Sequence, residues 1–63
     1  MQGKVNWYDE TKGFGFIIGD NEKSYFVHRS FINSKDTLKK DDSVTFTPTN
    51  TEKGLQAHKV GLV

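Results

Sequence analysis

The sequence predicts an all-β fold in which five short antiparallel strands close into a small barrel. Apolar residues recur along the chain with a period of two, and no helical period persists. Gly, Asn, Asp and Pro gather at the breaks between these runs, as is typical of turns. Because no helices are available to cover a sheet, closure into a barrel is the simplest way to remove exposed strand edges.

The alternating side chains place each strand in order. They are Val5 and Trp7, then Phe14, Phe16 and Ile18, then Phe26 and His28 against Tyr25 and Val27, then Val44 and Phe46. We expect strands near Gly3 to Tyr8, Gly13 to Ile18, Tyr25 to His28, Ser43 to Thr47 and Gln56 to Val60.

Turn residues separate these strands. The turns are expected at Asp9 to Lys12, Gly19 to Asn21, Asn33 to Asp36, Asp41 to Asp42 and Pro48 to Gly54. One turn of 3₁₀ helix is expected over Ser30 to Ile32. A bulge in the first strand would exchange the faces of its side chains, so the side to which Tyr8 points is left open.

Length and composition exclude several classes of protein. The 63 residues allow one domain, residues 1–63, and the absence of Cys excludes disulfides and Cys-type zinc sites. No apolar run exceeds three residues, so we expect a cytoplasmic protein without a membrane partner. Nine Lys and Arg against eight Asp and Glu give a net charge of +1, which argues against a polybasic duplex binder.

Aromatic residues are concentrated in the first half of the chain. Phe, Trp and Tyr make up 13% of the residues, and all of them except Phe46 lie between residues 7 and 31. In the segment from Lys12 to Ile17, Phe14 and Phe16 project from one side of a strand while the alternating glycines place no side chain on the other. Phe26 and His28 share a face of the next strand, so pairing of the two strands would gather four rings, which Trp7 could extend.

Exposed rings beside a lysine are suited to binding single-stranded nucleic acid. Every base has a π-face, and each stacked base contributes about 1–3 kcal/mol. A few stacked bases can therefore give micromolar affinity with few ion pairs, so balanced charge is no objection.

Several segments resemble the cold-shock proteins of bacteria. They are Gly3-Lys4-Val5, Trp7-Tyr8, Lys12 to Ile17 and Phe26-Val27-His28, followed by Ser30, Ile32, Thr37-Leu38, Gly54 and Gln56-Ala57. The resemblance implies a five-stranded OB-fold that binds single-stranded RNA and DNA with little sequence preference and prevents RNA secondary structure. It also implies that Trp7, Lys12, Phe14, Phe16, Phe26 and His28 line the binding surface, and it implies no catalysis.

The chain departs from the family pattern at four places. Asn6 replaces a common lysine, Leu55 replaces a proline, and the loop over Asn33 to Asp36 is two residues short and lacks an aromatic. Arg29 replaces an aromatic, but a guanidinium can also lie on a base and contact phosphate, so we include Arg29 in the expected site.

Other interpretations compete with this one. Each ring could instead pack in the core, and for Phe31 and Phe46 we prefer a position in the core or at its rim. His28 could ligate a metal, but His58 is the only other imidazole, and we expect no cofactor, no small-molecule substrate and no enzymatic activity. An SH3-like barrel that binds peptides through its aromatic surface is the main alternative, and we expect a monomer in either case.

Overall fold

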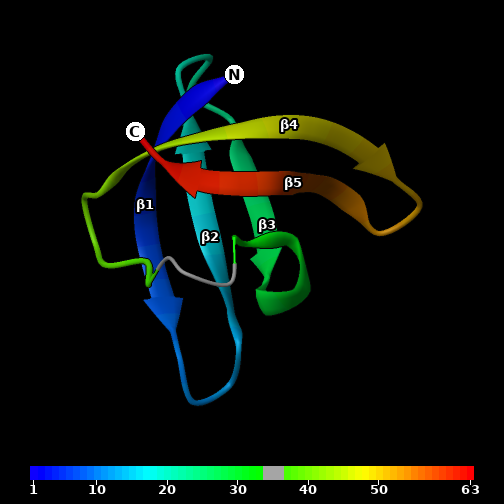
Figure 1. Cartoon of the computed structure of the whole chain (residues 1–63). Coiled ribbons are helices and arrows are strands. Elements are labelled where there is room, and N and C mark those ends of the chain that lie inside the picture. The colour runs from blue at the N-terminus through cyan, green and yellow to red at the C-terminus, as the bar shows by residue number, and fades with distance from the viewer. Residues whose placement is uncertain (34–36) are drawn as a thin grey trace.

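The computed structural model describes residues 1–33 and 37–63. In that part of the chain the elements are β1 (Gln2–Asp9), β2 (Phe14–Gly19), β3 (Ser24–His28), η1, one turn of 3₁₀ helix (Arg29–Phe31), β4 (Ser43–Thr51) and β5 (Gly54–Leu62). The strands close into a barrel in the order β1-β2-β3-β5-β4 (Figure 1). The predicted all-β barrel of five strands is confirmed.

The strand directions differ from the prediction at one pair. All neighbours in the barrel are antiparallel except β3 and β5, which run parallel where Phe26 lies opposite Gln56. A closed ring with an odd number of strands cannot alternate direction all the way round. One parallel pair is therefore required by closure itself, and it lies beside the ring-bearing strand β3.

The core of the barrel consists of aliphatic side chains and two rings. The buried residues are Val5, Ile17, Tyr25, Val27, Leu38, Val44, Phe46, Ala57 and Val60. The rings of Tyr25 and Phe46 contact each other with centroids 4.9 Å apart, so the expected core position of Phe46 is confirmed. Full burial of an aliphatic or aromatic side chain contributes about 1.5–3 kcal/mol, which makes these positions the main source of stability in a chain without disulfides.

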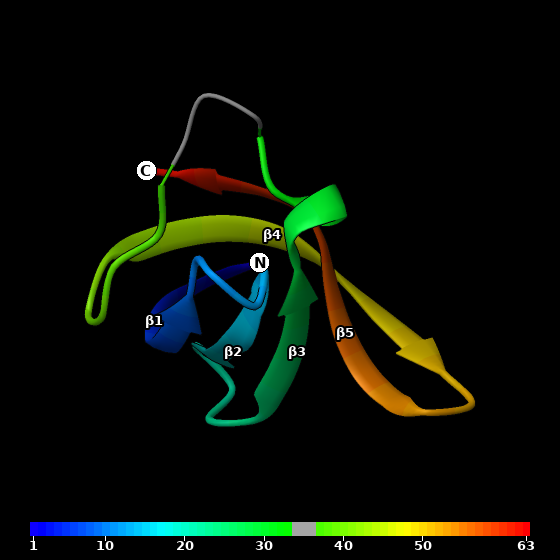
Figure 2. The ribbon, with the colours of Figure 1, turned by 90° about the horizontal axis from the view of Figure 1, so that it is seen from below.

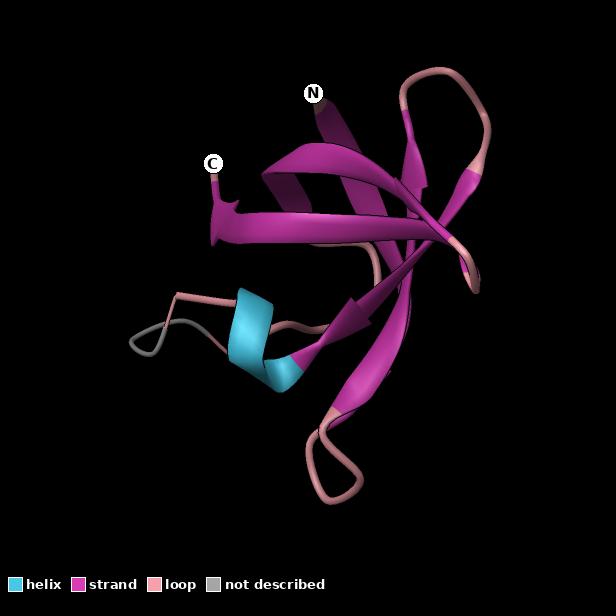
Figure 3. Ribbon diagram, turned by 90° about the vertical axis from the view of Figure 1, so that its right-hand side faces the viewer, coloured by secondary structure: helices cyan, strands magenta, loops and turns pink. Residues whose placement is uncertain are grey.

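The hairpin of β4 and β5 is longer than predicted. The turn expected over Pro48 to Gly54 is confined to the two residues between the strands, and β4 continues through Pro48 to Thr51. Pro48 is compatible with the strand because β1 pairs with β4 only over Ser43 to Thr45 and Met1 hydrogen-bonds to Phe46, which leaves β4 from Thr47 onward without a second partner strand among the described pairings. The hairpin runs across the β1–β3 sheet and projects sideways beyond β3 (Figure 1), and Figure 3 views the molecule from that side.

The 3₁₀ turn begins one residue earlier than predicted. His28 caps η1, because its ring accepts a hydrogen bond from the backbone N–H of Ser30 at 3.1 Å. Residues 34–36 of the turn expected over residues 33–36 lie outside the described part of the chain, so the shortened loop is not assessed by the structure.

Candidate nucleic-acid interface

A bulge in β1 decides where Trp7 lies. Val5 pairs with Ile17 and Trp7 pairs with Phe16, and the register shifts between these two pairs at Asn6. The extra residue exchanges the faces, so Val5 is buried whereas Trp7 is 40% exposed on the outer face of the barrel. Tyr8 then packs against the core, which answers the question left open by the sequence.

Three phenylalanines join Trp7 on this outer face. Phe16 lies opposite both Trp7 on β1 and Phe26 on β3, and Phe14 is the next residue of β2 on the same face, two positions away. The centroid distances are 5.8 Å for Trp7 and Phe14, 5.7 Å for Trp7 and Phe16, 5.9 Å for Phe14 and Phe26, and 5.7 Å for Phe16 and Phe26. We call these four residues the aromatic platform.

The rings of the aromatic platform contact one another without stacking face to face. All four contacts are tilted or edge-to-face, with interplanar angles between 31° and 75°. Such contacts contribute about 0.5–1.5 kcal/mol each beyond buried area. The three phenylalanines are only partly buried, so a continuous apolar and π-rich surface faces solvent across β1, β2 and β3.

The opposite sides of β2 and β3 face inward, as predicted. Tyr25 and Val27 are buried, and Gly15 lies opposite Val27. A Cβ built on Gly15 would collide with the backbone oxygen of Trp7 and lie 2.7 Å from the Cα of Tyr8. Glycine at this position therefore allows β1 and β2 to approach closely behind the platform.

Lys12 lies in the loop between β1 and β2, next to the Phe14 end of the platform. Asp9 organises this loop, since its side-chain Oδ1 accepts hydrogen bonds from the backbone N–H groups of Thr11 at 2.9 Å and Lys12 at 3.1 Å. The Lys12 side chain is exposed. Lys12 is thus an exposed cation two residues before Phe14 in the chain.

His28 lies on the same face of β3 as Phe26, as the alternation predicts, but its ring contact among the described residues is not with a phenylalanine of the platform. It lies opposite Phe14 and is exposed, but its ring contact in the described structure is with Phe31, at a centroid distance of 6.4 Å. Its Nδ1 accepts hydrogen bonds from the N–H and hydroxyl of Ser30, at 3.1 and 3.0 Å. The fourth ring in contact with the phenylalanines is therefore Trp7, and His28 adjoins the platform at its edge.

Arg29 is attached to the loop between β1 and β2. Its Nη2 donates a hydrogen bond to the backbone oxygen of Glu10 at 3.0 Å, and its guanidinium lies about 3.1 Å from where a Cβ on Gly13 would be. Its backbone N–H also donates to the oxygen of Gly13 at 2.8 Å. Arg29 therefore positions the loop that carries Lys12, and its side chain remains exposed.

Sequence analysis did not single out the contribution of the hairpin between β4 and β5. Lys53, Leu55 and Gln56 join Phe16 and Phe26 around a hollow of about 430 Å³ at the side of the platform. Gln56 lies opposite Phe26 in the parallel pair. Only the full length of this hairpin brings these residues beside β2 and β3, and no local pattern in the sequence indicates that length.

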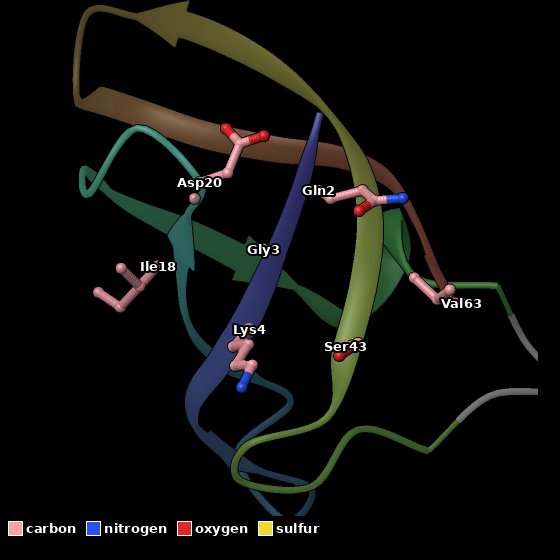
Figure 4. Close-up of a pocket in the computed structure, with 8 residues that line it drawn as sticks. Gln2, Gly3, Lys4, Ile18, Asp20, Ser43 and Val63 are labelled. Carbon is pink, nitrogen blue, oxygen red and sulfur yellow. The ribbon is translucent and has the colours of Figure 1, made fainter.

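A further hollow of about 520 Å³ lies over β1, lined in part by Gly3, Lys4, Ile18 and Asp20. Figure 4 shows the labelled side chains spread around the β1 ribbon without converging on one point. Within residues 1–33 and 37–63 no group of three or more His, Cys, Asp or Glu side chains is arranged to hold a metal ion. In the same residues no helix has the length and apolar character needed to cross a membrane.

The fold defines an OB-type barrel, a class whose strand faces and loops bind oligonucleotides or oligosaccharides. Comparison with known families agrees, because the family described as 'Cold-shock' DNA-binding domain matches residues 1–63. The chain belongs to the cold-shock domain family, which confirms the resemblance found in the sequence.

Individual relatives cover nearly the whole chain. A "Cold shock-like protein" of Thermotoga maritima is 43% identical over 65 residues, covering 100% of this chain and 98% of the relative. "Cold shock-like protein CspA" of Vibrio cholerae is 46% identical over 63 residues, covering 95% and 90%. Among solved structures, "drosophila Unr CSD456" is similar with a TM-score of 0.79 and 26% identity. The match covers 98% of this chain but only 26% of that one.

Proposed function

We propose that this protein binds single-stranded RNA and DNA with low sequence specificity by stacking bases on the aromatic platform. In the cell it would act as an RNA chaperone or as a cold-shock regulator of transcription or translation. The observation that carries the proposal is the unbroken contact of Trp7, Phe14, Phe16 and Phe26 on one exposed face. Membership of the cold-shock domain family supports it.

Stacking of bases on the platform can give micromolar affinity for a single strand without a strongly basic surface. Each stacked base contributes about 1–3 kcal/mol, and micromolar binding requires about 8 kcal/mol. Three or four stacked bases supply this amount when each contributes about 2–3 kcal/mol, aided by Lys12 and Lys53 beside the platform. The net charge of +1 is consistent with such a mechanism.

The remaining residues of the proposed site surround the platform. His28 extends it beyond Phe14, and Arg29 contacts phosphate from the loop between β1 and β2. The hollow beside Phe16, Phe26 and Gln56 receives one base edge, where the Gln56 amide can donate or accept hydrogen bonds. The proposed function requires no catalytic step, cofactor or membrane, and a single chain supplies all of these groups.

Trp7 provides a direct test, because it is the only tryptophan and lies in the platform. Titration with oligo(dT) is expected to quench its fluorescence as bases stack on it. A proline-rich peptide is the control, because aromatic surfaces also hold such peptides. Quenching by the peptide and none by oligo(dT) would instead identify a peptide-binding barrel.

Arg29 yields a separate prediction about salt dependence. Each phosphate neutralised on a single strand contributes about 0.7 to the slope of log affinity against log salt. Arg29→Phe is expected to keep affinity within about 1 kcal/mol at moderate salt, since a ring replaces the guanidinium as stacking surface, and to make the slope shallower by about 0.7. Arg29→Ala is expected to lower both affinity and slope.

The measurement for Arg29 is a fluorescence titration at several salt concentrations for the wild type and both variants. Its hydrogen bond to Glu10 gives a competing explanation, in which the residue only holds the loop. If both variants keep the wild-type affinity and slope, Arg29 has that structural role alone and is removed from the site.

A further inference from the structure

The most closely stacked pair of rings in the described structure lies outside the aromatic platform. Phe31 in η1 and His58 on β5 stack with centroids 4.0 Å apart and an interplanar angle of 16°. Both side chains are partly exposed. Figure 2 shows η1 at the end of β3, next to β5, so the pair bridges two elements that are remote in sequence.

Two routes connect this pair to the aromatic platform. On one side His28 contacts Phe31 and lies opposite Phe14. On the other side the Nε2–H of His58 donates to Oε1 of Gln56 at 3.1 Å, and Gln56 lies opposite Phe26. These contacts and pairings form a path of neighbouring rings and one amide, Gln56, from the aromatic platform to His58 on β5.

A hollow of about 540 Å³ adjoins the stacked pair. Its lining includes Phe31, Ile32, His58 and Lys59, with backbone of Gly61, and it contains no acidic residue among the described residues. This volume lies within the range of about 300–1,000 Å³ that is typical of small-ligand sites. The combination of an aromatic wall and an exposed lysine matches a nucleotide, which has an apolar base and an anionic phosphate.

We propose that the Phe31–His58 pair and this hollow form a further subsite, which takes one nucleotide of a single strand already held on the aromatic platform. The inference rests on the proposed function, because continuity with the platform is what identifies the occupant. The base lies against the outer side of the stacked pair, and Lys59 neutralises the adjacent phosphate. The strand therefore runs from β1 across β2 and β3 and ends over β5.

The test compares oligo(dT) of about four nucleotides, one for each platform ring, with oligo(dT) of about eight, a span within the known range for OB-folds. For His58→Ala and Phe31→Leu, affinity for the longer strand is expected to fall about tenfold, while affinity for the shorter strand changes less than about twofold. Phe31→Leu keeps an apolar side chain in the partly buried position but removes the π-face. Thr45→Ala, on the exposed side of β4, is the matched control.

The outcomes separate the subsite from the proposed function. If the wild type binds both strands and the two variants bind both equally well, the subsite is overturned while the proposed function stands. An equal loss for both lengths would also overturn it, because the pair would then act through the fold. If the wild type binds neither strand, the proposed function itself fails, and the subsite fails with it.

Discussion

Phe16→Ala is expected to weaken the binding of single-stranded oligonucleotides by about 1–3 kcal/mol, the value of one stacked base. Phe16 is the centre of the aromatic platform, because it lies opposite both Trp7 and Phe26 and contacts both rings. The free energy of unfolding is expected to fall by less than the 3–5 kcal/mol typical of truncating a buried Phe, since this side chain is partly exposed. Trp7 fluorescence measures binding, and urea titration measures stability.

Val27→Ala is the matched control on the next strand. Val27 is fully buried and faces the core from β3, so its truncation should lower stability and leave the affinity of the folded fraction unchanged. A large stability loss in Phe16→Ala with normal affinity would show that Phe16 is a core residue. A binding defect in Val27→Ala without a stability defect would show that the two faces are assigned in reverse.

Gly15→Ala is expected to destabilise the fold by about 3 kcal/mol or more, at the upper end of the cost of overpacking. The added Cβ would collide with the backbone oxygen of Trp7 and approach the Cα of Tyr8. Neither atom can rotate away, because both belong to the backbone of β1. The two strands would have to separate, and the rings they carry would move apart with them.

Ser24→Ala provides the comparison for Gly15→Ala. Ser24 is exposed at the start of β3, and a surface change of this kind usually alters stability by less than about 0.5 kcal/mol. A chain of this size has a total stability of only about 3–9 kcal/mol, so the glycine variant should be largely unfolded at moderate urea. Unchanged stability in Gly15→Ala would contradict the close approach of β1 and β2.

The alternation of side chains was sufficient to predict the strands and most of their faces. Phe14, Phe16 and Phe26 lie outside and Tyr25 and Val27 inside, because period two is a direct consequence of strand geometry. The place of Trp7 depended on a bulge at Asn6, which breaks that period. The alternation of side chains in a strand can be recognised in a sequence, but the position of a bulge cannot be recognised as regularly.

The features that the sequence did not reveal depend on contacts between distant segments. The pairing of β4 with β5 extends through Pro48, a residue that locally indicates a turn. The hydrogen bond of Arg29 to Glu10 and the stack of Phe31 on His58 join residues that only the pairing of several strands brings together. No pattern within one strand encodes such contacts.

The central claim is that base faces, and not phosphates alone, are recognised by the aromatic platform. The most direct measurement is a Trp7 fluorescence titration with a single-stranded oligonucleotide and with a duplex that contains the same strand, each at two salt concentrations. Duplex stacking hides the base faces from a flat surface, so the single strand is expected to bind at least about tenfold more tightly at both salt concentrations. Equal affinity for the two forms would contradict recognition by stacking and would leave phosphate contacts as the basis of binding.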